Sequence, residues 1–546
     1  GQVAVVDPDA GPDARPSART ISAEADFRDP YPIAEDLFLV ANGAKLQVID
    51  IEGTALTMYQ LPDDSIGAGM WCHEPRPLRP RPRERKMLPR VDLAKATGRL
   101  VLANIYEGRN MDSVEPGDIR KLLVLESLPK PINYTGGMDP LSYGGTFTLE
   151  RVVGTVPVEP DGSAYFELPA LRSFFFVALD ENDMSVKRMQ SFLTVQPGET
   201  TSCVGCHEQR TRTVMPTGSL MATRRPPSPV TPIEGVPEVF DFPRDIQPIL
   251  DRNCVRCHAY ERPPDAAGPE SGPRAGGVIL TGDRGPMFSH SYYTLTYLGQ
   301  FADGRNRAQS NLAPRTIGAV ASPIMQKITG DHYGVALPRH EIDMIRYWIE
   351  SGAAYPGTYG ALGSGSIGGY YQNQLVETDR EWPSTRAAGE AIQRRCVSCH
   401  TGPKVLPQSL SDERGVSFWR PDWNDPRMRL ARHIVFNLSR PEASLMLLAP
   451  LSKQAGGYGI CADQNVPVFA NTDDEDYQRI LAMCAAGKQR LNEIKRFDMP
   501  GFRPPDPYLR EMVRYGVLTG IPGDAEPVDP YALDRAYWRS QWFAPG

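Results

Sequence analysis

The motif Cys-x-x-Cys-His occurs three times in this chain of 546 residues. The copies are Cys203-Val-Gly-Cys206-His207, Cys254-Val-Arg-Cys257-His258 and Cys396-Val-Ser-Cys399-His400. Two thiols one helical turn apart can add to the two vinyl groups of one haem, and the adjacent imidazole then lies under the iron as its proximal ligand. This spacing is the attachment signature of c-type haem. The sequence therefore predicts three covalently attached haem c groups.

Zinc sites and redox dithiols also use Cys-x-x-Cys, but neither requires a histidine at the next position of every copy. The motifs use six of the nine cysteines and three of the eight histidines. Cys461 and Cys484 form the remaining close pair, and we expect a disulfide between them rather than two buried thiols. Cys72 has no obvious partner in the sequence.

Composition limits the class of protein. Asp and Glu number 66 against 59 Lys and Arg, for a formal net charge of −7, so we expect no nucleic-acid partner. A hydrophobic content of 41% is enough for the cores of several domains. The apolar runs are too short to cross a bilayer, and we expect no membrane span.

The chain begins at Gly1, without an initiator methionine, a basic segment or an apolar segment. Covalent haem attachment takes place outside the cytoplasm, so we expect an export signal that has been removed, or further sequence upstream. The expected location is periplasmic or extracellular.

The first part of the chain has the pattern of β structure. Residues 1–30 are rich in Pro, Asp and Ala and are predicted to form an extended arm or linker. An Asn42-Gly43 turn between two apolar runs predicts a hairpin. The tract from Pro75 to Arg85 is either an extended surface crossing or a source of arginines for haem propionates.

Further strands are predicted at 146–158, 164–168 and 173–179. The chain then runs directly into Cys203. We therefore predict one β-rich domain over residues 31–230, a sandwich or a propeller blade, with the first haem at its edge.

An internal duplication follows. Residues 246–258 match 389–400, in each case an amphipathic helix that ends at a haem motif, and each copy ends in a closing helix, at 341–352 and 476–487. This order of elements is typical of a small cytochrome c domain. The predicted fold class is α+β, a β-rich region followed by two tandem, mostly α-helical cytochrome c-like domains. Their predicted bounds are 235–356 and 383–520, with a linker at 357–382 and a C-terminal tail at 521–546.

The sixth iron ligands are less certain from sequence than the proximal ones. In a small cytochrome c domain the distal ligand commonly lies just before the closing helix, and His332 occupies that place. His340, next to the helix start, is expected in solvent. In the third motif's domain the matching segment is Gly456-Gly-Tyr-Gly459, so another residue must serve. We expect His433, the non-motif histidine of that domain, with Met499 as the rival.

For the first haem the sequence names no distal ligand. His73, beside Cys72, is the stronger candidate and His290 the weaker, while a packed structural role is the ordinary alternative for a single histidine. An open first haem is also consistent with the sequence.

Several segments resemble a known family. Gly154-Thr-Val-Pro-Val158, Asp161-Gly-Ser-Ala-Tyr-Phe166 and the stretch from Gln196 to Glu208 are similar to the alpha subunit of hydrazine synthase and its relatives. The resemblance covers most of residues 30–520. It implies an N-terminal β-propeller, a middle domain with one unusual c-type haem, and a cytochrome-like domain with a bis-histidine haem.

The chain departs from that family in three ways. The sequence before residue 150 is too short for a whole propeller. The tyrosine that the synthase is associated with as an iron ligand is missing from His207-Glu-Gln-Arg-Thr211, and a third haem domain is added.

Three functions fit these observations. The leading one is an extracytoplasmic triheme cytochrome that passes electrons to redox protein partners. The second is a haem enzyme that acts on a small nitrogen or oxygen compound at the first haem. The third is a subunit of a larger cytochrome assembly or filament, through self-association or other cytochrome subunits.

Overall fold

A computed structural model describes residues 1–7, 9, 15–83, 85–206, 218–261, 274–304, 311–363, 366–368, 378–463 and 466–546. The chain divides into two compact units at Pro89 and Arg90. The tract from Pro75 to Arg85, which precedes this boundary, has no helix or strand among its described residues. The single β-rich domain predicted over 31–230 is therefore corrected to parts of two units.

The first unit is a four-stranded antiparallel sheet with one short helix, α1 (Asp63–Gly67). The strands lie in sequence order: β3 (Phe27–Pro32), β4 (Leu37–Asn42), β5 (Lys45–Asp50) and β6 (Ala55–Gln60). Asn42 pairs with Lys45 across a turn in which Gly43 has φ +54°, a conformation that glycine adopts without strain. The predicted hairpin is confirmed.

The N-terminal segment is not an extended arm. Strand β1 (Ala4–Val6) pairs antiparallel with β2 (Ala18–Thr20). Val3 and Ile21 are buried and pack in one cluster with Phe27 of β3. The few apolar residues of this Pro- and Asp-rich segment are therefore enough to hold it on the sheet, and the predicted arm is wrong.

The second unit begins with two packed sheets. One has the strand order β12-β11-β8-β9 and the other β10-β7-β13. The strands are β7 (Thr97–Leu102), β8 (Lys121–Ser127), β9 (Glu150–Pro157), β10 (Ala164–Pro169), β11 (Phe174–Leu179), β12 (Ser185–Arg188) and β13 (Thr200–Cys203). The strands predicted at 146–158, 164–168 and 173–179 are confirmed.

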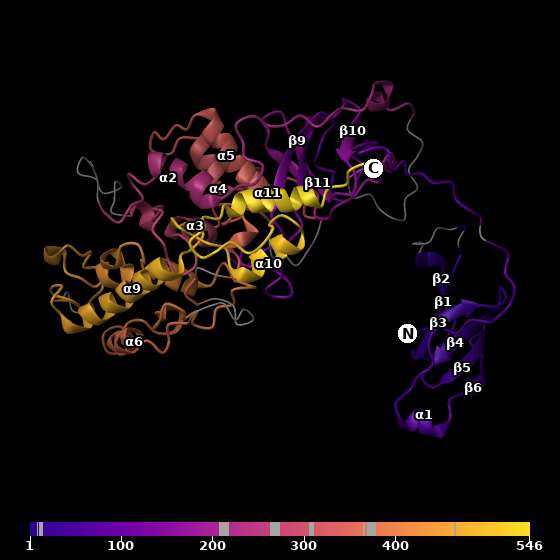
Figure 1. Cartoon of the computed structure of the whole chain (residues 1–546), viewed down its shortest axis with the longest axis horizontal. Helices are drawn as coiled ribbons and strands as arrows, with labels where there is room; N and C mark the ends of the chain where they lie inside the picture. The colour runs from indigo at the N-terminus through magenta and orange to yellow at the C-terminus, as the bar shows by residue number, and fades with distance from the viewer. Residues whose placement is uncertain are drawn as a thin grey trace. The chain divides into compact units, whose positions relative to one another are not determined.

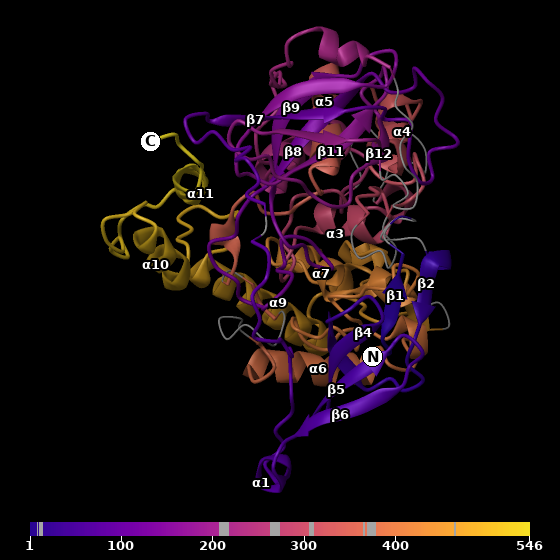
Figure 2. The same cartoon turned by 90° about the vertical axis from the view of Figure 1, so that its right-hand side faces the viewer.

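Strand β8 is buried on both faces because its side chains alternate between two cores. Leu122 and Val124 pack between the two sheets, whereas Leu123 and Leu125 face the cluster formed with the helices. Figure 2 shows α5 on this side of the β8-β9-β11 sheet. The sheet is therefore the platform on which the helical region is built.

The helical region follows (Figure 1). Its helices are α2 (Gln247–Asn253), α3 (His290–Tyr297), α4 (Pro323–Thr329), α5 (Arg339–Glu350), α6 (Pro383–Arg395), α7 (Arg432–Val435), α8 (Leu445–Leu448) and α9 (Glu475–Ile494). A two-residue pair, β14 (Ala462–Asp463) with β15 (Val466–Pro467), precedes α9. Strands early and helices late confirm the predicted α+β class.

The C-terminal segment is folded rather than a tail. Helices α10 (Asp506–Arg514) and α11 (Pro530–Ser540) share a core to which Tyr359 belongs. The buried Asp534 of α11 accepts hydrogen bonds from Thr358 and from the backbone N–H of Tyr359. The described start of the predicted 357–382 linker is thus packed. Within the described ranges, we find no helix with the length and apolar character that a membrane crossing needs.

Candidate haem centres

The second and third motifs have the same local structure. Helix α2 ends with Cys254 as its C-terminal cap, and α6 ends in the same way with Cys396. The N–H of His258 donates to the carbonyl of Cys254 at 3.0 Å, and that of His400 donates to the carbonyl of Cys396 at 2.9 Å. Each attachment turn therefore directly follows the last residue of a helix, as the sequence predicted.

The rings of His258 and His400 make the same hydrogen bond, through Nδ1. Nδ1 of His258 lies 3.0 Å from the carbonyl oxygen of Ala275, and Nδ1 of His400 lies 3.0 Å from that of Lys404. A carbonyl oxygen only accepts, so Nδ1 carries the proton in both rings. Nε2 is left with its lone pair, as an iron ligand requires.

His332 lies opposite His258. The ring centres are 6.2 Å apart and the ring planes differ by 9°. Two metal–imidazole bonds of roughly 2 Å on opposite sides of one iron would separate the ring centres by roughly 6 Å. The structure therefore brings together the proximal and the predicted distal histidine of the second haem at a spacing that fits one iron between them.

The attachment helices are tied to the closing helices in both copies. Arg252 and Asn253 at the end of α2 bond to Glu341 in the first turn of α5, at 2.7 and 2.8 Å. Arg394 at the end of α6 bonds to Asp476 in the first turn of α9 at 2.7 Å. This repeated pairing places the start of each closing helix beside a haem motif.

His433 lies away from the third motif. Its neighbour Arg432 donates to the carbonyl of Leu410, and Leu410 in turn donates to Asp379, which lies just before α6. Cys396 follows the other end of α6, whose 13 residues span roughly 20 Å. The expectation that His433 closes the third haem is therefore corrected.

His433 is instead a packed core side chain. Its ring contacts Tyr143, Phe288 and Tyr293, and Nε2 lies 3.7 Å from Oε1 of Glu413. Burial lowers the pKa of His433 to about 4 and the Arg432 guanidinium adds to the shift, so the ring is neutral at neutral pH.

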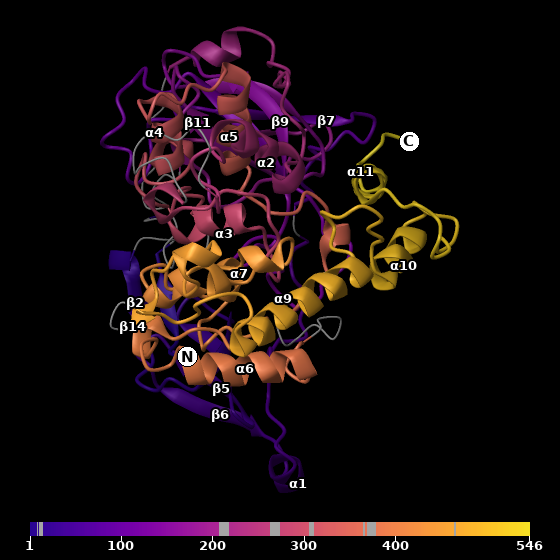
Figure 3. The same cartoon turned by 90° about the vertical axis from the view of Figure 1, so that its left-hand side faces the viewer.

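Met499, the rival ligand, is also remote from the third motif. It follows the end of α9, and its Sδ accepts from the N–H of Arg496 at 3.4 Å. The start of α9 is the end that lies beside Arg394, and 20 residues of helix span roughly 30 Å. Figure 3 shows α9 running from beside α6 toward α10.

The remaining histidines of the chain are His290, His340, His73 and His207. His290 is fully buried on α3, where it bonds to Tyr260 and to the carbonyl of Phe436, so both of its ring nitrogens have partners. His340 lies exposed in the first turn of α5, as expected. His73 lies in the first unit, where Nδ1 is 3.9 Å from Asp29. His207 lies outside the described residues.

The first motif begins on a strand. Cys203 ends β13, the edge strand that pairs parallel with β7, so the first attachment site lies at the sheet edge as predicted. The N–H of Cys206 donates to the carbonyl of Glu107 at 2.7 Å. A Cβ added to Gly108 would lie 2.0 Å from the carbonyl oxygen of Cys206, so this close approach requires glycine.

Two cationic side chains lie near the first motif. Burial lowers the pKa of the Lys187 ammonium, and the nearby Cys206 thiol opposes and Arg109 adds to this shift. The Lys187 amine donates to the carbonyl of Leu312 at 2.6 Å. No signal in the sequence singled out Lys187, because its burial depends on packing.

Cys461 and Cys484 are both free thiols, so the predicted disulfide is wrong. Cys484 is fully buried in α9, where its sulfur lies 3.5 Å from the hydroxyl of Ser444. Cys461 is a neighbour of Cys396: burial raises the pKa of the Cys396 thiol to about 11, and Cys461 adds to that shift.

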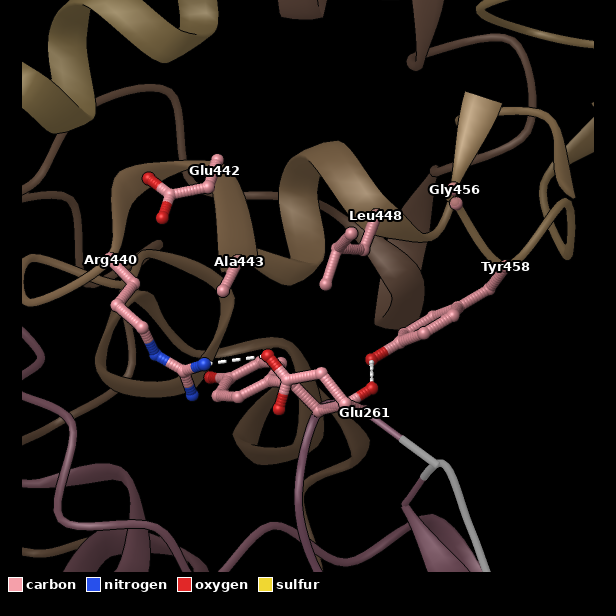
Figure 4. A pocket seen from close by; sticks show the side chains of 9 residues that line it. Glu261, Arg440, Glu442, Ala443, Leu448, Gly456 and Tyr458 are labelled. Atoms are coloured by element: carbon pink, nitrogen blue, oxygen red, sulfur yellow. Dashed lines mark hydrogen bonds and ion pairs between the residues drawn. The ribbon is translucent and has the colours of Figure 1, made fainter. Parts of the chain in front are cut away.

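A cavity of about 380 Å³ lies between the segment that follows the second motif and residues 440–458 (Figure 4). Tyr260 and Glu261, directly after the second motif, line one side, and Gly456 to Tyr458 line the other. The Tyr458 hydroxyl donates to the carbonyl of Tyr260 at 2.7 Å. Arg440 extends along the cavity and bonds to Glu261 at 2.6 Å.

One segment of the chain matches a known protein family. Residues 117–208, from the strand β8 to the first haem motif, match the family model of the hydrazine synthase alpha subunit middle domain. The chain carries a hydrazine synthase alpha-like middle domain. The match confirms the resemblance predicted from the sequence over this segment.

A solved structure of Kuenenia stuttgartiensis hydrazine synthase is similar over 65% of this chain, with 17% sequence identity and a TM-score of 0.47. The match covers 58% of that chain. No curated protein matches this chain.

Proposed function

We propose that the protein is a triheme c-type cytochrome that transfers electrons outside the cytoplasm, with two cytochrome c-like domains at 235–356 and 383–520. The observation that carries the proposal is the pair His258 and His332, with ring centres 6.2 Å apart and nearly parallel planes. An iron closed by a histidine on each side favours electron transfer over binding of a substrate.

The residues that would hold the three haems are the motif side chains: Cys203, Cys206 and His207; Cys254, Cys257 and His258; Cys396, Cys399 and His400. Each bound haem supplies reversible one-electron exchange between ferric and ferrous iron. The protein orients His258 and His400 through their Nδ1 hydrogen bonds, which also set their basicity.

The two domains are joined where electrons would pass. The hydrogen bond between Tyr458 and the carbonyl of Tyr260 links the segment after the second motif to a loop beside the third. Arg440 adds bonds to Asp283 and Glu261 at the same junction. These contacts support a fixed distance between the second and third haems.

A second candidate is a haem enzyme that acts on a small nitrogen or oxygen compound at the first haem. The family match supports it, because the matched domain ends at the first motif. Lys187 and Arg109 would give this centre a positive environment that suits an anionic or polar compound.

A third candidate is a subunit of a larger assembly. The matching family is described as a subunit, which supports further protein partners for this chain. We expect redox proteins or other cytochrome subunits in that role.

The test uses the intact protein. Its denatured mass should exceed the polypeptide mass by three haems, and a reductive titration should show three one-electron steps. Low-spin spectra that CO does not change support electron transfer at all three haems. A high-spin, CO-binding haem would favour the enzyme, and a mass with fewer than three haems would contradict the proposal.

A further inference from the structure

The third haem motif has a third cysteine beside it. The Cys461 thiol lies close enough to influence the pKa of Cys396, and the Cys399 thiol in turn influences that of Cys461. Hydrogen bonds place the same residue independently. Arg395, which precedes Cys396, donates to the carbonyl of Val468, and the N–H of Val468 donates to the carbonyl of Cys461 at 3.4 Å.

The loop that carries Cys461 is held in place by the backbone. Tyr458 donates to the carbonyl of Leu448 at 2.7 Å, and Gly459 donates to that of Leu451 at 2.8 Å. The N–H groups of Ile460 and Cys461 both donate to the carbonyl of Ala449, at 3.0 and 3.2 Å. The backbone of Cys461 is therefore held by a hydrogen-bonded loop that follows α8.

The duplicated domain shows what this loop corresponds to. In the second haem's domain the segment between α4 and α5 carries His332, whose ring faces His258. In the third haem's domain the segment between α8 and α9 carries Cys461. Each segment follows a short helix and precedes a closing helix whose first turn bonds to the attachment helix.

We propose that Cys461 would serve as the second axial iron ligand of the third haem, beside the proximal His400. The inference rests on the proposed attachment of that haem to Cys396 and Cys399. It replaces His433 and Met499, which lie toward the far ends of α6 and α9.

The coordination step is a simple exchange of a proton for a metal bond. Binding to ferric iron forms a sulfur–iron bond, and the S–H proton passes to solvent with no change in oxidation state. An anionic thiolate stabilises ferric iron, so the third haem should have a lower potential than a bis-histidine haem.

The experiment compares electron paramagnetic resonance spectra of the full-length protein and of Cys461→Ala and Cys461→His. The wild type should show one low-spin ferric signal with the narrow g-anisotropy of a histidine–thiolate haem. In Cys461→Ala that signal should disappear, and one further haem equivalent should become high-spin and bind CO. In Cys461→His it should become a bis-histidine signal. Cys72→Ala, a thiol in the first unit, is the matched control and should retain the wild-type spectrum.

Intact mass distinguishes a failure of Cys461 as a ligand from a failure of the triheme proposal. A wild-type and Cys461→Ala mass with three haems, together with an unchanged low-spin spectrum in Cys461→Ala, overturns Cys461 as a ligand and leaves the triheme proposal standing. A wild-type mass that lacks the third haem overturns both.

Discussion

Tyr458 donates a hydrogen bond of 2.7 Å to the carbonyl of Tyr260 and so joins two segments that each belong to a haem centre. Tyr260 lies two residues after His258, and Tyr458 lies three residues before Cys461. Burial raises the pKa of Tyr458 to about 12, so the phenol remains a donor throughout the physiological range. One side-chain hydrogen bond thereby connects the surroundings of the second and third haems.

Removing this donor should weaken the junction. In Tyr458→Phe the carbonyl of Tyr260 loses its partner, and the free energy of unfolding should fall by about 1 kcal/mol. Guanidinium unfolding monitored by fluorescence measures the change. Tyr333→Phe, at an exposed ring, is the control and should have no effect. Equal stability of the two variants would mean that the bond contributes nothing to the junction.

His332→Ala should open the second haem. The variant loses the imidazole that faces His258 across 6.2 Å, so one haem should become high-spin and bind CO while the mass still shows three haems. The measurement is the optical spectrum of the reduced protein with and without CO. His340→Ala removes an exposed imidazole from the next helix and should leave the spectrum unchanged. An unaltered low-spin spectrum in His332→Ala would exclude this residue as the ligand.

Gly108→Ala should disturb the first haem centre. The new methyl group would lie 2.0 Å from the carbonyl oxygen of Cys206, so the attachment loop must move, at an overpacking cost of roughly 1–3 kcal/mol. We expect a fraction of the protein to lack one haem by intact mass. Gly137→Ala has open space around the added methyl and should carry the full complement. Full haem occupancy and wild-type stability in Gly108→Ala would show that the loop adapts.

Stability should fall as the solution becomes acidic, in part because of His433. Burial lowers its folded-state pKa to about 4, below the ordinary value of roughly 6.5, so the unfolded chain binds the proton more readily. The stabilisation is complete above pH ~6.5 and is lost progressively down to pH 4, with a slope of up to ~1.4 kcal/mol per pH unit. Burial lowers the pKa of His290 to about 4 as well, and it adds a similar dependence.

The measurement is guanidinium unfolding at several pH values between 4 and 7. His433→Leu should lower stability at pH 7 and flatten the slope, whereas His340→Ala should keep it. Burial raises the pKa of Glu413 but the Arg432 guanidinium outweighs it, for a net value of about 2 in the folded protein. The unfolded chain binds the Glu413 proton below about pH 5, so this carboxylate adds to the slope at the acid end of the range. A slope that is unchanged in His433→Leu would contradict the assignment.

The sequence predicted features that depend on neighbours along the chain. The Asn42-Gly43 hairpin, the helices that end at Cys254 and Cys396, and the strand that runs into Cys203 are all in the structure. Each rests on local turn chemistry or on a hydrophobic period, which an isolated segment already contains. The prediction of an extended N-terminal arm was wrong because Val3 and Ile21 pack against Phe27 of β3. The composition of the segment does not reveal that contact.

The larger error of the sequence-based prediction is the sixth ligand that it assigned to the third haem. A search by residue type favours His433, because a histidine is the familiar ligand and Cys461 can be assigned to a disulfide with Cys484. The structure separates those cysteines and places His433 in an aromatic core. Residue type alone gives no information on which end of α6 a side chain lies near.

The sequence by itself specified three candidate attachment motifs, because two thiols and an imidazole within five residues are brought together by one helical turn. Tertiary structure alone decided what faces each proximal histidine. That choice depends on how closing helices and loops far along the chain pack against the attachment helix, as in the bonds of Glu341 to Arg252 and of Asp476 to Arg394. Such packing is set by the burial of whole faces of helices and sheets, which no short motif encodes.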